Sequence, residues 1–280
     1  MPGVRAGQRF SRFVRISAVA AICAVTACET SKPNPCEALA SSLTESLVDF
    51  TFGATGTQGP TTLRRWGSPI KFAIVGDRNR FVRDQIIQKQ TKLSQATGVD
   101  ISFFDDYSWN DAVTVRNMVA SGLVNQIFFI VNGSASEFME KHRASITMST
   151  NSTNSWDNIE RLLPNPNDWA CATILGTANG LEISSAIATI ATGVLPTEFW
   201  ACMAGISLRP FGLVYQKADP RFTIFDDRAP EGTEFNAYDR LILQTYNSAK
   251  LKPGMSRGQA QILIKDEISS GLQSRNLCKS

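Results

Sequence analysis

Histidine is nearly absent from this chain: its 280 residues include only one, His142. Catalysis by a serine or cysteine nucleophile usually needs a histidine base held by an acidic partner. Zinc peptidases of the HExxH type hold their metal with two or three histidines. His142 lies among charged residues, which is typical of an exposed helix surface, and its neighbours in sequence do not indicate a catalytic network. We therefore expect neither chemistry.

Nucleotide-binding motifs and a membrane-spanning run are also missing. The sequence contains no GxxxxGK[ST] loop and no GxGxxG motif after a predicted strand, so no cofactor is expected. The apolar run at residues 16–27 has twelve residues, whereas a helix needs about 20 to cross a bilayer. A short run of this kind indicates the core of a signal peptide.

The first residues predict export. A basic leader without acidic residues precedes the apolar run, and its charges are Arg5, Arg9, Arg12 and Arg15. The run ends in Val25-Thr26-Ala27-Cys28, which resembles the lipobox of bacterial lipoproteins. The resemblance implies cleavage before Cys28 and acyl chains such as palmitate on that cysteine, which would hold the protein on a membrane. The alternative is an ordinary cleaved signal peptide in which Cys28 is incidental.

These signals divide the chain into a signal peptide (1–27), a lipidated tether (28–35) and one globular domain (36–280). The tether is short and polar and contains Pro33 and Pro35. We expect the domain to lie on the periplasmic side of the cell envelope. Glu29 follows the cysteine, where an aspartate would have indicated retention in the inner membrane, so the outer membrane is slightly favoured.

Cleavage removes the basic character of the chain. The four leader arginines leave 24 of the 28 basic residues against 25 acidic ones, a net charge of about −1. No stripe of basic residues with interleaved aromatic residues remains, so we expect no nucleic-acid partner.

The cysteine count predicts disulfides. Four cysteines remain once Cys23 has left with the leader and Cys28 is acylated, which is an even number in an oxidising compartment. Of the three pairings, we favour Cys171 with Cys202 and Cys36 with Cys278, because the second would join the two ends of the domain. Buried free thiols are the alternative.

Hydrophobic periodicity predicts helices and strands mixed along the chain. Expected helices occupy residues 36–50, 82–96, 134–142, 196–208 and 256–272, expected strands occupy 70–74, 99–104, 127–131, 171–175 and 182–191, and a loop is expected at 51–62. The predicted class is α+β or mixed α/β, as a single mixed helix/sheet domain. Two pairs of acids, Asp105-Asp106 and Asp226-Asp227, follow strands or turns, where solvated turn residues are the ordinary interpretation.

Several motifs resemble an uncharacterised family of exported bacterial proteins, domain-of-unknown-function family 2927. They are Leu63-Arg64-Arg65-Trp66, Phe211-Gly212-Leu213 after Cys202, Thr223-Ile224-Phe225-Asp226-Asp227, Tyr238-Asp239-Arg240-Leu241, Tyr246 and Leu251-Lys252-Pro253-Gly254-Met255. The resemblance covers roughly residues 60 to 260 and brings no activity with it.

The C-terminal third of the chain also resembles a metzincin-type zinc peptidase without its metal site. If Gly212 takes the place of the glycine in HExxHxxGxxH, the ligand positions fall on Gly205, Arg209 and Tyr215, and the general-base position falls on Ile206. None of these four side chains can perform those roles. Members of family 2927 usually have two acids and a glutamine near Gly205, Ile206 and Arg209, so this chain departs from its family there as well.

The sequence therefore favours a non-catalytic, exported lipoprotein that binds a peptide, glycan or envelope protein. The groove between strand 182–191 and the following helix is the expected binding place, and a zincin-like fold without a metal is the expected architecture. Two alternatives stay open: a carboxylate- or metal-dependent envelope hydrolase, motivated by the paired acids, and a structural envelope component.

Overall fold

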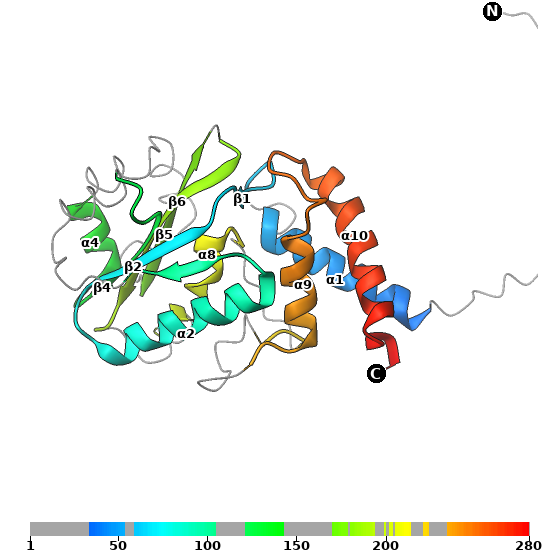
Figure 1. The fold of residues 1–280 in the computed structure, drawn as a ribbon, viewed down its shortest axis with the longest axis horizontal. Helices are drawn as coiled ribbons and strands as arrows, with labels where there is room; N and C mark the ends of the chain where they lie inside the picture. The colour runs from blue at the N-terminus through cyan, green and yellow to red at the C-terminus, as the bar shows by residue number, and fades with distance from the viewer. Residues whose placement is uncertain are drawn as a thin grey trace, which may run out of the picture. The chain divides into compact units, whose positions relative to one another are not determined.

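The apolar and alternating runs of the sequence form one sheet of six strands (Figure 1). The computed structural model describes residues 34–53, 59–104, 121–142, 170–178, 180–193, 199, 202–203, 205–213, 221–223 and 234–279. The strands are β1 (Arg65–Trp66), β2 (Ile70–Gly76), β3 (Ile101–Phe103), β4 (Gln126–Val131), β5 (Cys171–Ala178) and β6 (Glu182–Ala191).

Four of these strands run parallel in the order β3-β2-β4-β6, and β5 pairs antiparallel with β6. The short β1 pairs with the first residues of β6, and β4 pairs with the residues that follow them, so β6 has partners on both edges. This pairing disfavours the addition of a peptide strand to residues 182–191. Among the described strands, β1, β3 and β5 each pair with a single neighbour.

The helices are α1 (Pro35–Phe52), α2 (Arg80–Thr97), α4 (Ala135–Lys141), α8 (Leu208–Phe211), α9 (Ala237–Tyr246) and α10 (Arg257–Ser274), followed by the 3-10 turn η1 (Leu277–Lys279). Polar side chains fix where the long helices begin. The Asn79 side chain caps α2, and reciprocal capping boxes open α9 at Asn236 and α10 at Ser256. Gly98 ends α2 in the left-handed conformation, with φ at 72°.

Each face of the sheet is apolar, as expected for parallel strands covered on both sides. One face buries Val75, Ile127 and Phe129 together with Ala135 of α4. On the opposite face, a single apolar cluster joins the strands to α2 and to the segment that follows β6. Its buried members include Phe72, Phe128, Ala188 and Ile190 of the strands, Val82 and Ile86 of α2, and Cys202, Met203 and Ile206.

Helices α1, α9 and α10 form a separate apolar cluster at the amino end of the parallel strands (Figure 1). The predicted stripe of α10 is buried: Ala260, Ile264, Ile268 and Leu272 are all fully enclosed. Helices α1 and α10 run antiparallel, because Arg257 at the start of α10 binds Asp49 near the end of α1 (2.6 Å), whereas Cys36 at the start of α1 is bonded to Cys278.

These elements confirm the predicted mixed helix/sheet class. Residues Asn34–Ser280 form one compact unit, distinct from Met1–Pro33. The predicted loop 51–62 begins too early, because α1 continues through Thr51 and Phe52, both buried. Within the described part of the chain, no helix combines the length and hydrophobicity needed to cross a bilayer.

Candidate functional site

The segment of residues 202–213 carries most of the positions that the metzincin resemblance singled out. It crosses the face of the sheet formed by β5 and β6, where Cys202 is bonded to Cys171 of β5 with their Cα atoms 5.6 Å apart. The segment is helical at residues 202, 203 and 205 and turns at Ile206 and Ser207 before α8 begins. Pro210 then falls in the first turn of α8, where a missing backbone N–H is tolerated.

Three of the four positions that correspond to the metal ligands and general base of a metzincin lie in this segment; we call the four the degenerate cleft positions. Gly205 is buried, Ile206 is fully enclosed in the apolar layer beneath the sheet, and Arg209 is half-buried. Tyr215 lies outside the described residues. The position of a general base is thus occupied by an apolar side chain with no acid–base chemistry, and Gly205 offers no ligand atom.

Arg209 is the charged residue among these four positions. Burial lowers the pKa of its guanidinium, because the charged form loses hydration. An arginine still remains protonated under these conditions, and a fixed positive charge at this place would repel a metal cation. The side chains of residues 205–209 therefore do not form a zinc site.

Three polar side chains are buried on this side of the sheet, and we call them together the polar belt: Gln90, Gln126 and Ser207. They are 1%, 1% and 5% exposed. Among the described residues, both amide atoms of Gln90, the Nε2 of Gln126 and the Oγ of Ser207 have no hydrogen-bond partner.

The belt lies where the apolar layer under the sheet meets the cluster of α1, α9 and α10. On α2, Ile86 belongs to the layer under the sheet and Leu93 to the helical cluster, and Gln90 lies between them. On the segment of residues 202–213, Ser207 separates Ile206 from Leu208 in the same way. Sequence analysis missed the belt, although a glutamine on the apolar stripe of α2 was a detectable signal.

Arg65 ties β1 to the end of α9. Its guanidinium donates to the backbone carbonyls of Asn247 (2.9 Å), Ser248 (2.7 Å) and Leu251, and to the side-chain oxygen of Asn247 (2.8 Å). Carbonyls at a helix end have no partner within the helix and carry partial negative charge, so a buried cation is stabilised there. Burial nevertheless lowers the pKa of Arg65.

Trp66 and Tyr246 extend these contacts to α8. We call the place where residues 62–66 meet α8, the end of α9 and residues 247–256 the junction. The Trp66 indole donates to the carbonyl of Pro210 (2.9 Å), and the Tyr246 hydroxyl lies 2.6 Å from the carbonyl of Arg64 and 3.2 Å from that of Phe211. Burial raises the pKa of Tyr246, so the hydroxyl stays protonated and donates. Gly212 leaves room for this hydroxyl, because a Cβ at that position would collide with it.

A second set of contacts closes the junction. The Leu63 N–H donates to the carbonyl of Met255 (2.8 Å), the Gly254 N–H donates to the carbonyl of Leu63 (2.9 Å), and Thr62 forms a β-bridge with Ser256. Four of the motifs on which the family resemblance rested, residues 63–66, residues 211–213, Tyr246 and residues 251–255, thus meet at one place although they are distant in sequence. Their hydrogen bonds are internal to the fold, which indicates an architectural role.

His142 lies at the carboxyl end of α4, where its ring packs on Phe138 with the ring centres 4.5 Å apart. Partial burial lowers its pKa, and the positive charge of Lys141 adds to the effect. Among the described residues, no group of three or more histidine, cysteine, aspartate or glutamate side chains is placed to hold a metal ion.

Other predicted positions lie outside the described residues. They are the lipid-attachment residue Cys28 and the acid pairs Asp105-Asp106 and Asp226-Asp227. The predicted disulfides are confirmed in both pairings, Cys36 with Cys278 and Cys171 with Cys202.

Comparison with known proteins gives one match. The sequence matches the family described as Protein of unknown function (DUF2927) over residues 40–266. No curated protein and no solved structure matches. The match includes the junction motifs and the segment of residues 202–213, and it covers most of the chain. The chain belongs to the DUF2927 family of proteins of unknown function.

Proposed function

We propose that this chain is an exported lipoprotein, cleaved before Cys28 and anchored by acyl chains on that cysteine, that works as a non-catalytic binding protein on the periplasmic side of the envelope. The main support for export is that all four cysteines of the described residues are paired in disulfides. Stable disulfides are typical of oxidising compartments and rare in the reducing cytosol. The lipobox-like Val25-Thr26-Ala27-Cys28 supplies the anchor.

Intact mass of protein extracted from bacterial membranes tests the anchor. We expect the mass of residues 28–280 plus acyl chains, less two mass units for each disulfide. A Cys28→Ala variant should lose the acyl chains and leave the membrane fraction. A mature chain that begins elsewhere and has no acyl mass would contradict the proposal.

A zincin-like fold without a metal is the architecture we propose for the domain. Its support is a parallel sheet with one antiparallel edge strand, β5, and a covering segment that reaches the position expected for the metal helix. Ile206 and Arg209 occupy that position, which favours binding over hydrolysis. The hydrolase and the structural component remain predictions that no described residue favours.

An extended peptide is the ligand class we propose, added as a strand along residues 171–174 of β5. Among the described strands, β5 pairs only with β6, and it is the longest of the strands with a single neighbour, with eight residues against three in β3 and two in β1. The Cys171–Cys202 disulfide holds this half of β5 against the covering segment. A rigid edge loses little conformational entropy when a peptide binds to it.

Calorimetry with a library of extended peptides tests this ligand class, and hydrogen exchange locates the site. A bound peptide should slow exchange at outward-facing amides of β5 and leave amides of α10 unchanged. Absence of measurable heat across the library, or protection confined to other elements, would count against strand addition at β5.

A further inference from the structure

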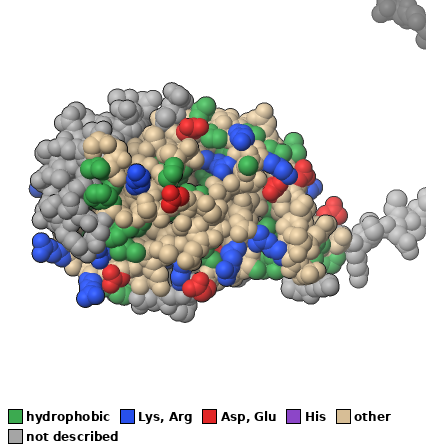
Figure 2. Space-filling model, in the orientation of Figure 1, with side chains coloured by type: hydrophobic (Ala, Val, Ile, Leu, Met, Phe, Trp, Pro, Cys, Tyr) green, Lys and Arg blue, Asp and Glu red, His purple; other side chains and the backbone are tan. Residues whose placement is uncertain are grey.

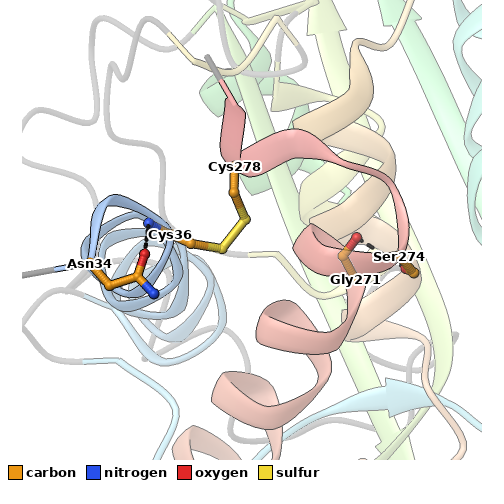
Figure 3. Close-up of a disulfide and its surroundings, with 5 residues drawn as sticks. All are labelled: Asn34, Cys36, Gly271, Ser274 and Cys278. Atoms are coloured by element: carbon orange, nitrogen blue, oxygen red, sulfur yellow. Dashed lines mark hydrogen bonds between the residues drawn. A yellow bond between two sulfur atoms is a disulfide. The ribbon is translucent and has the colours of Figure 1, made fainter.

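The chain enters and leaves the fold at a single end. Cys36 in the first turn of α1 is bonded to Cys278 in η1, with their Cα atoms 4.8 Å apart (Figure 3). The side chain of Asn34 accepts a hydrogen bond from the backbone N–H of Cys36 (3.1 Å), which fixes the direction in which the chain joins α1. We call this region, residues 34–37 and 271–279, the stapled end.

The tether limits how far the stapled end can lie from a membrane. Five residues lie between Cys28 and Asn34, which makes six steps along the chain, and a fully extended chain spans at most about 3.5 Å per step, so the reach is about 21 Å. Helix α1 has 18 residues, and at 1.5 Å per residue its length is about 27 Å. A lipid on Cys28 therefore cannot reach past the length of α1 to the opposite end of the helix pair, where Arg257 binds Asp49.

We propose that the stapled end faces the lipid headgroups and that the carboxyl ends of the parallel strands point away from the membrane. The inference rests on the proposed function, because it requires acyl chains on Cys28. The short tether gives the stapled end a higher effective concentration at the bilayer than any other surface of the domain.

The charges of the stapled end fit an anionic lipid surface. Residues 271–279 include two basic residues, Arg275 and Lys279, and no acidic residue, and Arg275 is exposed. Glu37 is the acidic residue in the first turn of α1. Basic residues near a bilayer are attracted to anionic headgroups. On the described part of the face drawn in Figure 2, basic and acidic side chains are interspersed over the domain.

This orientation would place the proposed peptide edge on the far side. Cys171 pairs with Ile190 and Ile174 pairs with Ile187, so residues 171–174 lie beside the carboxyl half of β6. In Figure 1 the carboxyl ends of the parallel strands and α4 lie at the opposite end of the sheet from α1 and α10. The edge of β5 would then be presented to partners away from the bilayer.

Energy transfer to the membrane tests the orientation. The full lipidated chain carries a donor dye on an unnatural amino acid, at Gln273 in one sample and at Lys141 in another; both positions are exposed. Each is inserted into vesicles of phosphatidylethanolamine and phosphatidylglycerol that contain an acceptor dye on a headgroup. We expect severalfold higher transfer from position 273 than from position 141. Lengthening the tether by about ten glycine and serine residues should reduce that difference.

Controls separate this inference from the anchor itself. Labelled Cys28→Ala protein should show no transfer above background from either position. Intact mass of each labelled sample reports acylation independently of the transfer signal. A chain without acyl groups would overturn the anchor and the orientation together. An acylated chain that gives equal transfer from both positions, or stronger transfer from position 141, would overturn the orientation alone.

Discussion

Gln90 interrupts the apolar stripe of α2 with a buried side-chain amide. It lies on the stripe of α2 between Ile86 and Leu93, and neither of its amide atoms has a hydrogen-bond partner in the part of the chain that the structure describes. A buried polar group without a partner costs about 1–3 kcal/mol, since its hydration is lost and not replaced. The polar belt therefore lowers the stability of the fold.

Replacing this amide should stabilise the protein. We expect Gln90→Leu to raise the free energy of unfolding by about 1 kcal/mol, because it removes the uncompensated desolvation at nearly constant volume. Gln88→Leu, on the exposed side of the same helix, is the matched control and should change it by less than about 0.5 kcal/mol. Urea unfolding measures both. A destabilised Gln90→Leu would mean that the amide does have partners in solution.

Gly212 provides a second test at the level of single residues. Its φ of 108° disfavours any side chain, and a Cβ there would meet the Tyr246 hydroxyl. Gly212→Ala should lower the free energy of unfolding by at least about 2 kcal/mol, because backbone strain and the collision act together. Gly98→Ala is the control, since Gly98 has a φ of 72° and open space around it, so it reports backbone strain with little collision.

Combining Gly212→Ala with Tyr246→Phe should separate the two contributions. Removal of the hydroxyl relieves the collision, so the alanine should cost less in the phenylalanine background than in the native one. Denaturation of the four proteins of this double-mutant cycle gives the coupling energy. Strict additivity would show that the hydroxyl does not limit the space at Gly212.

At the scale of elements, the sequence predicts those whose apolar spacing is undisturbed. Strand 182–191 matches β6 residue for residue, and the stripe of α10 is buried as expected. The expected helix at 196–208 is interrupted instead, because the chain turns at Ile206 and Ser207 and α8 begins afterwards. Local spacing indicates which residues are buried, but it does not report a break that tertiary contacts impose.

For a related reason, the sequence could not predict which strands are neighbours in the sheet. β1 has only two residues, and its pairing with β6 depends on Arg65 and Trp66 reaching α9 and α8. Such contacts join residues more than a hundred positions apart, and periodicity contains no information about them. The edge position of β5, and hence the proposed peptide site, became visible only with the sheet order.

The capping box of α10 can be tested by itself. Ser256→Ala removes the side-chain acceptor for the Gln259 N–H (3.4 Å), and we expect a loss of about 1 kcal/mol. Ser270→Ala, at an exposed position inside the same helix, should be neutral or slightly stabilising, because alanine is the better helix former. Thermal unfolding of the two variants distinguishes a capping effect from a general effect of removing a hydroxyl group.

For the whole molecule, the two disulfides should contribute unequally. Their sequence separations are 242 and 31 residues. In the chain-entropy account a longer closed loop restricts the unfolded state more, so removing the Cys36–Cys278 pair should cost roughly 1–2 kcal/mol more than removing the Cys171–Cys202 pair. Paired cysteine-to-alanine variants, compared by urea unfolding, measure the difference. The reverse order would show that packing around Cys202, which is buried, outweighs loop entropy.

If the chain is exported as proposed, the Cys36–Cys278 bond also sets an order of events during translocation. Cys36 precedes Cys278 by 242 residues, so it would cross the membrane well before its partner. The bond could then close only after the intervening residues had followed, whereas the Cys171–Cys202 bond could close while α10 was still emerging. A chain truncated before Cys278 would leave Cys36 as an unpaired thiol, and thiol-dependent quality control could then recognise an incomplete product.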